Sequence, residues 1–312
     1  MKKLSFISIL ILSIFSASSQ SCLPEGITFT TQSQIDSFQI NYPNCTEIEG
    51  DVKFYGYNDI NNLNSLNVLT SIGGDVWFQN NNALVNLTGL ENLTSILGDL
   101  TIGGLWYLGN DSLQNLTGLN NLTNIGGTLN ISDNPLLQSL TGLESLTSID
   151  GNLLVGNCLA KSEKTDSLRG GNTSLKNLAG LSNLSSLGGS IIIECNDSLN
   201  SLTGLEKLDS IEGLVLTSNQ SLQSLQGLDN LTYIGEDITI YYNELLSACD
   251  IESICNYLVV PNGTVNIHDN AEGCNSQQEI EEACASSISE NSSLYGIITQ
   301  PNPFTYSTAL SY

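Results

Sequence analysis

A unit of about 24 residues recurs along most of the chain and constrains the fold more than any other feature. The aliphatic anchors of successive units are separated by 24, 24, 29, 24, 38, 24 and 23 residues. They are Ile48, Ile72, Ile96, Ile125, Ile149, Leu187, Ile211 and Ile234. Two units therefore carry insertions of about 5 and about 14 residues. Self-similarity at this period is typical of a solenoid, in which each coil packs only on its neighbours.

Two periodicities within a unit predict its local structure. Leu or Ile recurs every third residue, as at Leu84, Leu87 and Leu90. An α-helix turns by about 100° per residue, so residues three apart fall short of a full turn and a long row of them would not stay on one face. The segment must therefore be extended, 3₁₀-like or a chain of turns. Apolar pairs such as Leu129 and Ile131 alternate instead, which is strand periodicity. We therefore expect an all-β-rich solenoid with one short strand per coil in a parallel sheet.

Polar and glycine positions also repeat. An Asn follows the strand in several coils, where its amide can bond the backbone of its own turn and of the next coil. This ladder is expected at Asn110, Asn134, Asn196, Asn219 and Asn243. Gly pairs at 73–74, 126–127 and 188–189 fit a bend that needs either positive φ or close approach of two backbones.

The motif L-x-I-x-x-N-x-x-L is similar to leucine-rich repeats. The I-x-G-x-L-x-I strand entry, with Asn44-Cys45-Thr46-Glu47-Ile48-Glu49-Gly50-Asp51 before the first coil, more closely resembles the receptor L domain. The resemblance covers roughly residues 22–285. It implies the β-solenoid of insulin and growth-factor receptor ectodomains, a family that binds proteins in animals. The coils here are more regular and no kinase is present, so hormone binding is not implied.

Both ends of the chain resemble targeting segments. Residues 1–19 have two lysines, an apolar stretch and a small-residue cleavage site, as in a secretory signal peptide. Lipidation at Cys22 is the rival reading, but Ser19-Gln20-Ser21 does not resemble a bacterial lipobox. Residues 301–312, with Pro-Asn-Pro-Phe, resemble the start of a truncated type IX sorting domain of Bacteroidetes surface proteins; the alternative is an ordinary polar tail. We expect a secreted or outer-surface protein.

Between these ends the chain divides into caps and coils. The expected segments are an N-terminal cap at 20–47, solenoid repeats at 48–248, a C-terminal cap at 249–285 and a linker at 286–300. In the first cap we expect a strand at Ile27–Phe29 and a short helix near Gln32–Gln39. Terminal coils of a solenoid need such caps because their leucines would otherwise face water.

The eight cysteines of an exported chain predict disulfides. Cys22 and Cys45 bracket the first cap, while Cys158 and Cys195 fall in adjacent coils near the strand ends. For the other cap we predict Cys249–Cys274 with Cys255–Cys284, although the spacing alone leaves the connectivity open. Zinc is the rival reading, but the spacings lack a C-x₂-C signature.

Composition excludes several functions. The chain has 8 basic and 32 acidic side chains and a formal net charge of −24, which excludes a nucleic-acid binder. Because the chain has a single His, His268, most catalytic triads and all metal sites with several His ligands are excluded. We expect His268 to be an ordinary residue of the strand face. No segment approaches the apolar length of a membrane span. We therefore expect no enzyme, metal, cofactor or transmembrane span.

Candidate contact residues are aromatic side chains expected on the outer sheet face or, for Trp106 and Tyr107, in the protruding five-residue insertion of the third coil. Exposed aromatic side chains on a rigid scaffold suit sugar stacking or anchoring of a protein; the alternative is that they pack on neighbouring coils. The candidates are Tyr55, Trp77, Trp106, Tyr107 and Tyr241. An apolar strip is also expected on this face, formed by Leu154, Ile192 and Val215. Either the insertion at 159–172 or a partner would cover it. Outward positions are also expected further along the strands, Ser132 and Thr217 among them.

These features predict a monomeric, non-enzymatic binding or adhesion module that recognises an extracellular protein or polysaccharide. The alternative is a structural spacer or surface-layer protein without a specific ligand. A glycan lyase would need basic residues beside clustered carboxylates on one face, which this composition disfavours.

Overall fold

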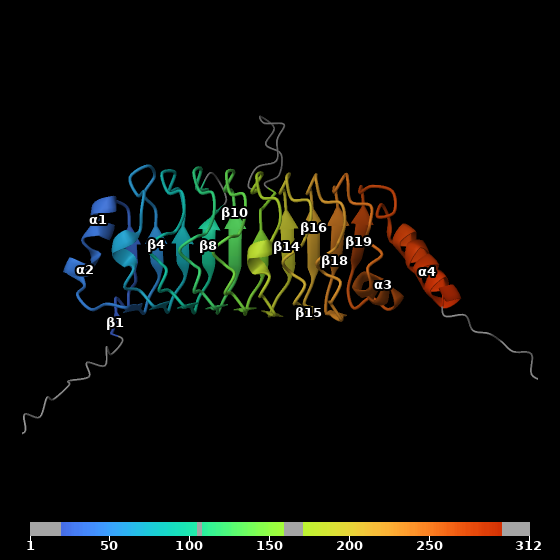
Figure 1. Ribbon diagram of the computed structural model, residues 1–312, viewed down its shortest axis with the longest axis horizontal. Helices are drawn as coiled ribbons and strands as arrows, with labels where there is room; N and C mark the ends of the chain where they lie inside the picture. Colours follow the sequence, from blue (N-terminus) through green and yellow to red (C-terminus); the bar gives the residue numbers. More distant parts are fainter. Residues whose placement is uncertain (1–19, 105–107, 159–170, 295–312) are drawn as a thin grey trace, which may run out of the picture.

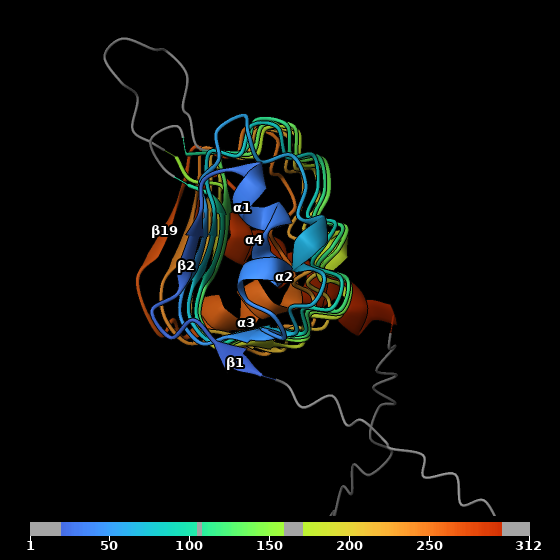
Figure 2. The same cartoon turned by 90° about the vertical axis from the view of Figure 1, so that its left-hand side faces the viewer.

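The computed structural model describes residues 20–104, 108–158 and 171–294. Its coils stack into one rod, and each coil adds a strand to a ten-stranded parallel sheet along one side (Figures 1 and 2). In spatial order the strands are β2 (Ile27–Phe29), β4 (Val52–Phe54), β6 (Val76–Phe78), β8 (Leu100–Gly103), β10 (Leu129–Ser132), β12 (Leu153–Val155), β14 (Ile191–Glu194), β16 (Leu214–Thr217), β18 (Ile238–Tyr241) and β19 (Val265–His268). The predicted solenoid of stacked coils is confirmed.

Each coil gives one strand to the ten-stranded sheet, as expected, and most coils also contribute a second, shorter strand that the sequence analysis did not predict. A seven-stranded parallel sheet contains β1 (Ser21–Cys22), β3 (Glu47–Ile48), β5 (Ser71–Ile72), β7 (Ser95–Ile96), β9 (Asn124–Ile125), β11 (Ser148–Ile149) and β13 (Ser186–Leu187). β15 (Ser210–Ile211) and β17 (Tyr233–Ile234) pair separately. Two residues are too few to show an alternating pattern, so the sequence gives no sign of these strands.

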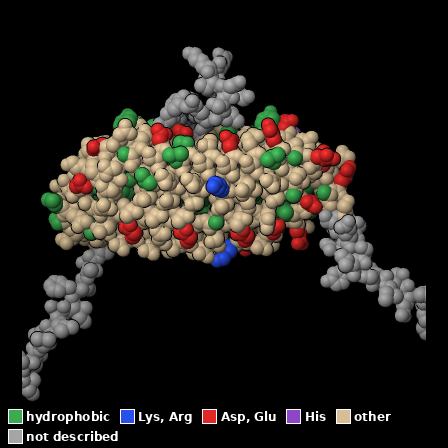
Figure 3. Space-filling model, turned by 45° about the horizontal axis from the view of Figure 1, so that its top comes forward, with side chains coloured by type: hydrophobic (Ala, Val, Ile, Leu, Met, Phe, Trp, Pro, Cys, Tyr) green, Lys and Arg blue, Asp and Glu red, His purple; other side chains and the backbone are tan. Residues whose placement is uncertain are grey.

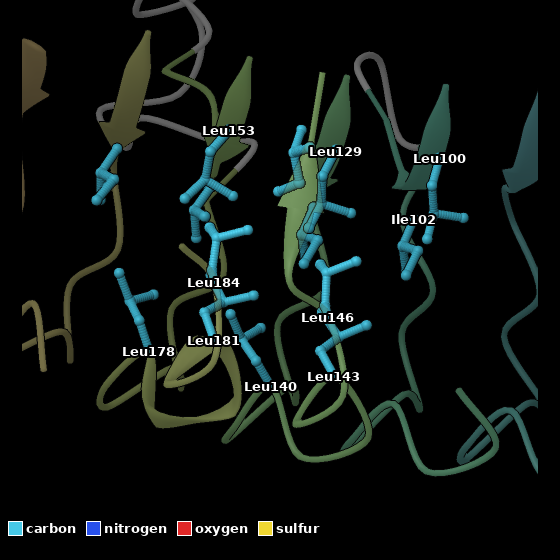
Figure 4. Packing of buried hydrophobic residues seen from close by; sticks show 14 of the residues in the cluster. Leu100, Ile102, Leu129, Leu140, Leu143, Leu146, Leu153, Leu178, Leu181 and Leu184 are labelled. Carbon is cyan, nitrogen blue, oxygen red and sulfur yellow. The ribbon is translucent and has the colours of Figure 1, made fainter. Parts of the chain in front are cut away.

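The leucine rows fill the space inside the coils. Leu140, Leu143 and Leu146 are fully buried, and Figure 4 shows them beside Leu181 and Leu184 of the neighbouring coil. The row is a chain of turns, as predicted: the Leu143 N–H donates to the Leu140 carbonyl at 3.2 Å, and the Leu146 N–H to the Leu143 carbonyl at 2.9 Å. Two coils tighten into 3₁₀ turns, η1 (Asn64–Leu66) and η2 (Ala179–Leu181).

A ladder of Asn side chains runs from the coil of β6 to the coil of β19, and all its members are buried except the half-buried Asn270. At each step the amide group donates to the side-chain oxygen of the next Asn and to a strand carbonyl of the preceding coil. The eight members are Asn81, Asn110, Asn134, Asn172, Asn196, Asn219, Asn243 and Asn270. The predicted ladder is thus present. It also includes Asn81, Asn172 and Asn270, which the sequence analysis did not assign to it.

Both ends of the rod carry caps (Figure 1). At the N-terminal end the predicted helix is two short helices, α1 (Gln32–Asp36) and α2 (Phe38–Asn41), separated by Ser37. At the other end lie α3 (Glu252–Val259) and α4 (Gln277–Leu294), and α4 ends inside the stretch that the sequence analysis assigned to a linker.

Four disulfides join the cysteine pairs that the sequence analysis proposed. Two of them tie the C-terminal cap together, one closes the N-terminal cap and one links adjacent coils. The pairs are Cys22–Cys45, Cys158–Cys195, Cys249–Cys274 and Cys255–Cys284.

Glycines stand where two coils touch through their backbones. None of the Gly pairs of the sequence analysis has positive φ, so close approach is the operative reason: a Cβ on Gly126 would lie 2.3 Å from the Leu97 carbonyl oxygen. A separate row does adopt positive φ. Gly118 has φ +117°, and a Cβ there would lie 2.0 Å from the carbonyl oxygen of Leu87 in the preceding coil.

Gly118→Ala is therefore expected to lower the free energy of unfolding by about 1–3 kcal/mol, from backbone strain and displaced neighbouring backbone. Urea unfolding measures the loss. Gly235→Ala is the matched control, because a Cβ there would first meet the flexible Tyr233 ring at 3.2 Å and its φ is not in the left-handed region. Equal losses in the two variants would contradict the close-approach explanation.

Candidate functional site

Outward side chains of the ten-stranded sheet form rows across the strands. Parallel pairing places Thr28 beside Lys53 and Lys53 beside Trp77. The same register continues the row through Leu154, Ile192 and later strands. Because adjacent strands lie about 4.8 Å apart, side chains of neighbouring coils in one row contact each other directly.

Four side chains at the N-terminal end of this face form a group that we call the N-terminal patch: Lys53, Tyr55, Tyr57 and Trp77. The Lys53 ammonium lies 4.5 Å from the centroid of the Trp77 ring. The Tyr55 and Tyr57 rings meet edge to face at 5.1 Å, and their hydroxyl oxygens are 3.3 Å apart. Two of the predicted contact residues, Tyr55 and Trp77, therefore lie within one group.

Hydrogen bonding separates the acidities of the two tyrosines. The bond from Tyr57, followed by one from Asn80, lowers the pKa of Tyr55, whereas the pKa of Tyr57 is raised chiefly by its bond to Tyr55. Tyr57 therefore keeps its proton longer and acts as the donor of the pair as pH rises. The patch therefore offers two hydroxyl groups with different acidities and one ammonium.

The N-terminal patch borders a hollow of about 360 Å³ on the sheet face. Its walls are the outward side chains of three adjacent strands and of the residues that follow them. They are Thr28 and Thr30, Lys53 and Tyr55, and Trp77 and Gln79, and Phe54 of β4 completes the lining. A hollow of this size lies within the range of small-molecule and sugar subsites, and its walls combine aromatic surface with hydroxyl, amide and ammonium groups.

A second aromatic group lies at the opposite end of the same face. The Tyr241 ring stacks on His268 with centroids 4.9 Å apart, and Tyr242 meets Tyr241 edge to face at 5.1 Å. His268 Nδ1 lies 2.8 Å from an Asp269 carboxylate oxygen. Tyr241 is thus half-buried against its neighbours, which leaves Tyr242, 51% exposed, as the more accessible ring of this pair.

The middle of the face differs from the expectation in one respect. Ser132 and Thr217 were expected to face outward but are 1% and 2% exposed. Ser132 pairs with Gly103 of the adjacent strand, and Thr217 Oγ1 donates at 3.1 Å to a carboxylate oxygen of Glu194, its register partner. Leu154, Ile192 and Val215 lie side by side and half-buried.

Several expected contact residues lie outside the described part of the chain. Trp106 and Tyr107 fall in the undescribed segment 105–107, and the insertion expected to cover the apolar strip falls mostly in 159–170. The targeting segments at 1–19 and 301–312 are also outside the described residues. These assignments remain predictions.

Charge is distributed unevenly over the rod. On the side drawn in Figure 3, acidic side chains follow its length, whereas basic ones are isolated. Lys53, Lys176 and Lys207 are the basic residues of the described segments, and Lys53 alone belongs to the outer face of the ten-stranded sheet. Across the described residues, no group of three or more His, Cys, Asp or Glu side chains could hold a metal ion, and no helix is long and apolar enough to cross a membrane.

Comparison with known proteins agrees with this architecture over part of the chain. Residues 44–104 match the family model of the receptor L domain. The match begins at the end of the N-terminal cap and runs through β8, so it contains Lys53, Tyr55 and Trp77. No curated protein matches the chain. The matched segment supports an extracellular ligand-binding type of domain. The coils that follow residue 104 repeat the same architecture.

The sequence analysis missed the residues that turn the patch into a hollow. Thr28 and Thr30 lie on and just after β2, which the sequence analysis predicted as a strand of the cap without placing it in the large sheet. The alternation of Ile27 and Phe29 around Thr28 was the available signal. Gln79 lies one residue after β6 and lines the hollow together with Trp77.

Proposed function

We propose that this protein is a secreted or cell-surface, non-enzymatic binding module that contacts an extracellular macromolecule with the outer face of its ten-stranded sheet. The observation that carries the proposal is the N-terminal patch with its hollow, because it places aromatic, hydroxyl and ammonium groups on paired strands of one parallel sheet. Preorganised contacts of this kind lose little conformational entropy when a ligand binds.

Three further features support the proposal. The signal-like residues 1–19 and the four disulfides fit export to an oxidising compartment. Aromatic residues lie at both ends of one face, so one extended ligand could reach both groups. The partial match to the receptor L domain, whose members bind extracellular ligands, includes the N-terminal patch. The partner is a protein or polysaccharide, and the module acts as a monomer.

A test compares the secreted full chain with the double variant Tyr55→Ala/Trp77→Ala on arrays of surface polysaccharides and extracellular proteins. Loss of these two rings is expected to weaken binding at least tenfold, the effect of about 1.4 kcal/mol at a contact hot spot. Tyr233→Ala is the matched control: Tyr233 is also an exposed aromatic residue, 58% accessible, but lies on β17 of the small sheet.

The rod shape favours one rival, a structural spacer that holds other modules away from a surface. A spacer predicts that the double variant and the Tyr233 control behave alike in every binding and adhesion assay. Binding by the wild type that survives loss of both rings would also contradict the proposed face.

A further inference from the structure

We propose that the hollow of the N-terminal patch is a subsite for a carboxylated sugar, a hexuronate unit of an acidic saccharide. This inference rests on the proposed function and specifies the ligand class for that face. Its starting point is the position of Lys53, which is the only described basic residue on the outer face of a chain with formal net charge −24.

Lys53 is held over the hollow but is not neutralised there. Its nearest carboxylate, on Asp51, is 3.9 Å away, and the two side chains are 49% and 46% exposed. A long, half-exposed ion pair contributes little stability, so a ligand carboxylate can replace Asp51 at low cost. A carboxylate on the ammonium forms a charge-assisted hydrogen bond, which is stronger than a bond between neutral groups.

The other walls fit the ring and hydroxyls of a sugar. Trp77 and Tyr55 offer apolar surface to the C–H face of a pyranose ring. Thr28, Thr30 and Gln79 offer hydroxyl and amide groups at the same hollow, whose volume of about 360 Å³ accommodates one sugar unit with part of the next.

The charge arrangement disfavours two other ligands. A cationic group would have to displace the Lys53 ammonium from the Trp77 ring, 4.5 Å away, and would meet a like charge there. A long polyanion would meet the acidic remainder of the rod, although at about 0.15 M salt the Debye length of about 8 Å screens charges beyond the nearest coils. Short acidic saccharides, or single acidic units within a mostly neutral polymer, avoid both repulsions: they carry a negative charge to Lys53 and place few negative charges against the rest of the rod.

The test uses tri-galacturonate and its methyl ester, which share rings and linkages and differ in the carboxylate charges and the small ester methyl groups. By titration calorimetry at low salt, the full-length protein is expected to bind the acid at least five- to tenfold more tightly than the ester. Lys53→Met should remove this preference, so that the acid and the ester bind with similar affinity. Trp77→Ala should weaken both ligands by a similar factor.

Lys176→Met is the matched control, because Lys176 is exposed but lies outside the large sheet, and it should keep the preference. Equal affinity for acid and ester, or a preference that survives Lys53→Met, overturns the carboxylate subsite while leaving ligand binding by the face intact. Binding of neither form also overturns the subsite. Capture of a peptide by its free carboxylate in the same hollow, with no sugar bound, would assign the site to a protein partner instead.

Discussion

Asn196→Ala is expected to lower the free energy of unfolding by about 3–5 kcal/mol, because several buried polar groups lose their partners at roughly 1–3 kcal/mol each. The Asn196 side-chain oxygen accepts from the backbone N–H of Asn172 at 3.1 Å and from its side-chain amide at 3.2 Å. The Asn196 amide donates to the Val155 carbonyl at 2.9 Å and to the side-chain oxygen of Asn219 at 3.3 Å. Ala replaces none of these bonds.

Guanidinium unfolding measures the loss, and Asn200→Ala is the control. Asn200 belongs to the same coil but is exposed, so its replacement should change stability by less than about 0.5 kcal/mol. Comparable losses for Asn196 and Asn200 would show that the ladder does not stabilise the rod. Hydrogen exchange should locate the damage in the coils on either side of the lost rung, because each coil contacts only its neighbours.

Asn196→Asp separates the donor from the acceptor role. The new carboxyl keeps an acceptor for Asn172 but, when ionised, lies against the Val155 and Glu194 carbonyl oxygens in a buried site. Burial and these oxygens raise its pKa in the folded state above the unfolded value of about 3.9. The variant should therefore be least impaired below about pH 4 and lose stability as pH rises toward the raised folded pKa. A pH-independent defect would contradict this account of the ladder.

The sequence predicts the solenoid from two periods in each unit. The three-residue period of the leucine rows is incompatible with a helix, and the two-residue period of the apolar pairs indicates a strand. Leu140, Leu143 and Leu146 must share one side, and three-residue turns achieve this. The ladder is predictable where an Asn follows the last apolar strand position by three residues, as at Asn134 and Asn196, and the same spacing after Phe78 would have identified Asn81. Asn172 follows the long insertion, so its distance from the strand β12 hides it, although the Gly171-Asn172 pair resembles Gly109-Asn110.

The candidate site was predictable in position but not in chemistry. Alternation around Phe54 and Phe78 places Lys53, Tyr55 and Trp77 on the outer face. It does not say that Lys53 leans over Trp77, since side-chain direction depends on neighbours in adjacent coils. The burial of Ser132 and Thr217 was missed for the same reason: period two assigns a face, whereas exposure also depends on the height of surrounding side chains.

Leu143→Ala is expected to cost about 2–5 kcal/mol, because the cavity left in a closely packed row cannot be filled by neighbours that belong to rigid coils. Leu143 is 0% exposed and lies between Leu140 and Leu146 of its own row (Figure 4). Leu97→Ala is the control, since Leu97 is 61% exposed and its removal should cost less than about 0.5 kcal/mol. Urea unfolding of both variants gives the two values.

The shared core makes this prediction specific to a solenoid. A coil of two dozen residues cannot bury its leucines alone, so a cavity in one coil weakens its contacts with both neighbours. Loss of protection from hydrogen exchange should therefore spread to the coils that contain Leu116 and Leu181 while the disulfide-linked caps stay protected. A uniform loss over the whole chain, caps included, would indicate one cooperative core in place of coil-by-coil packing.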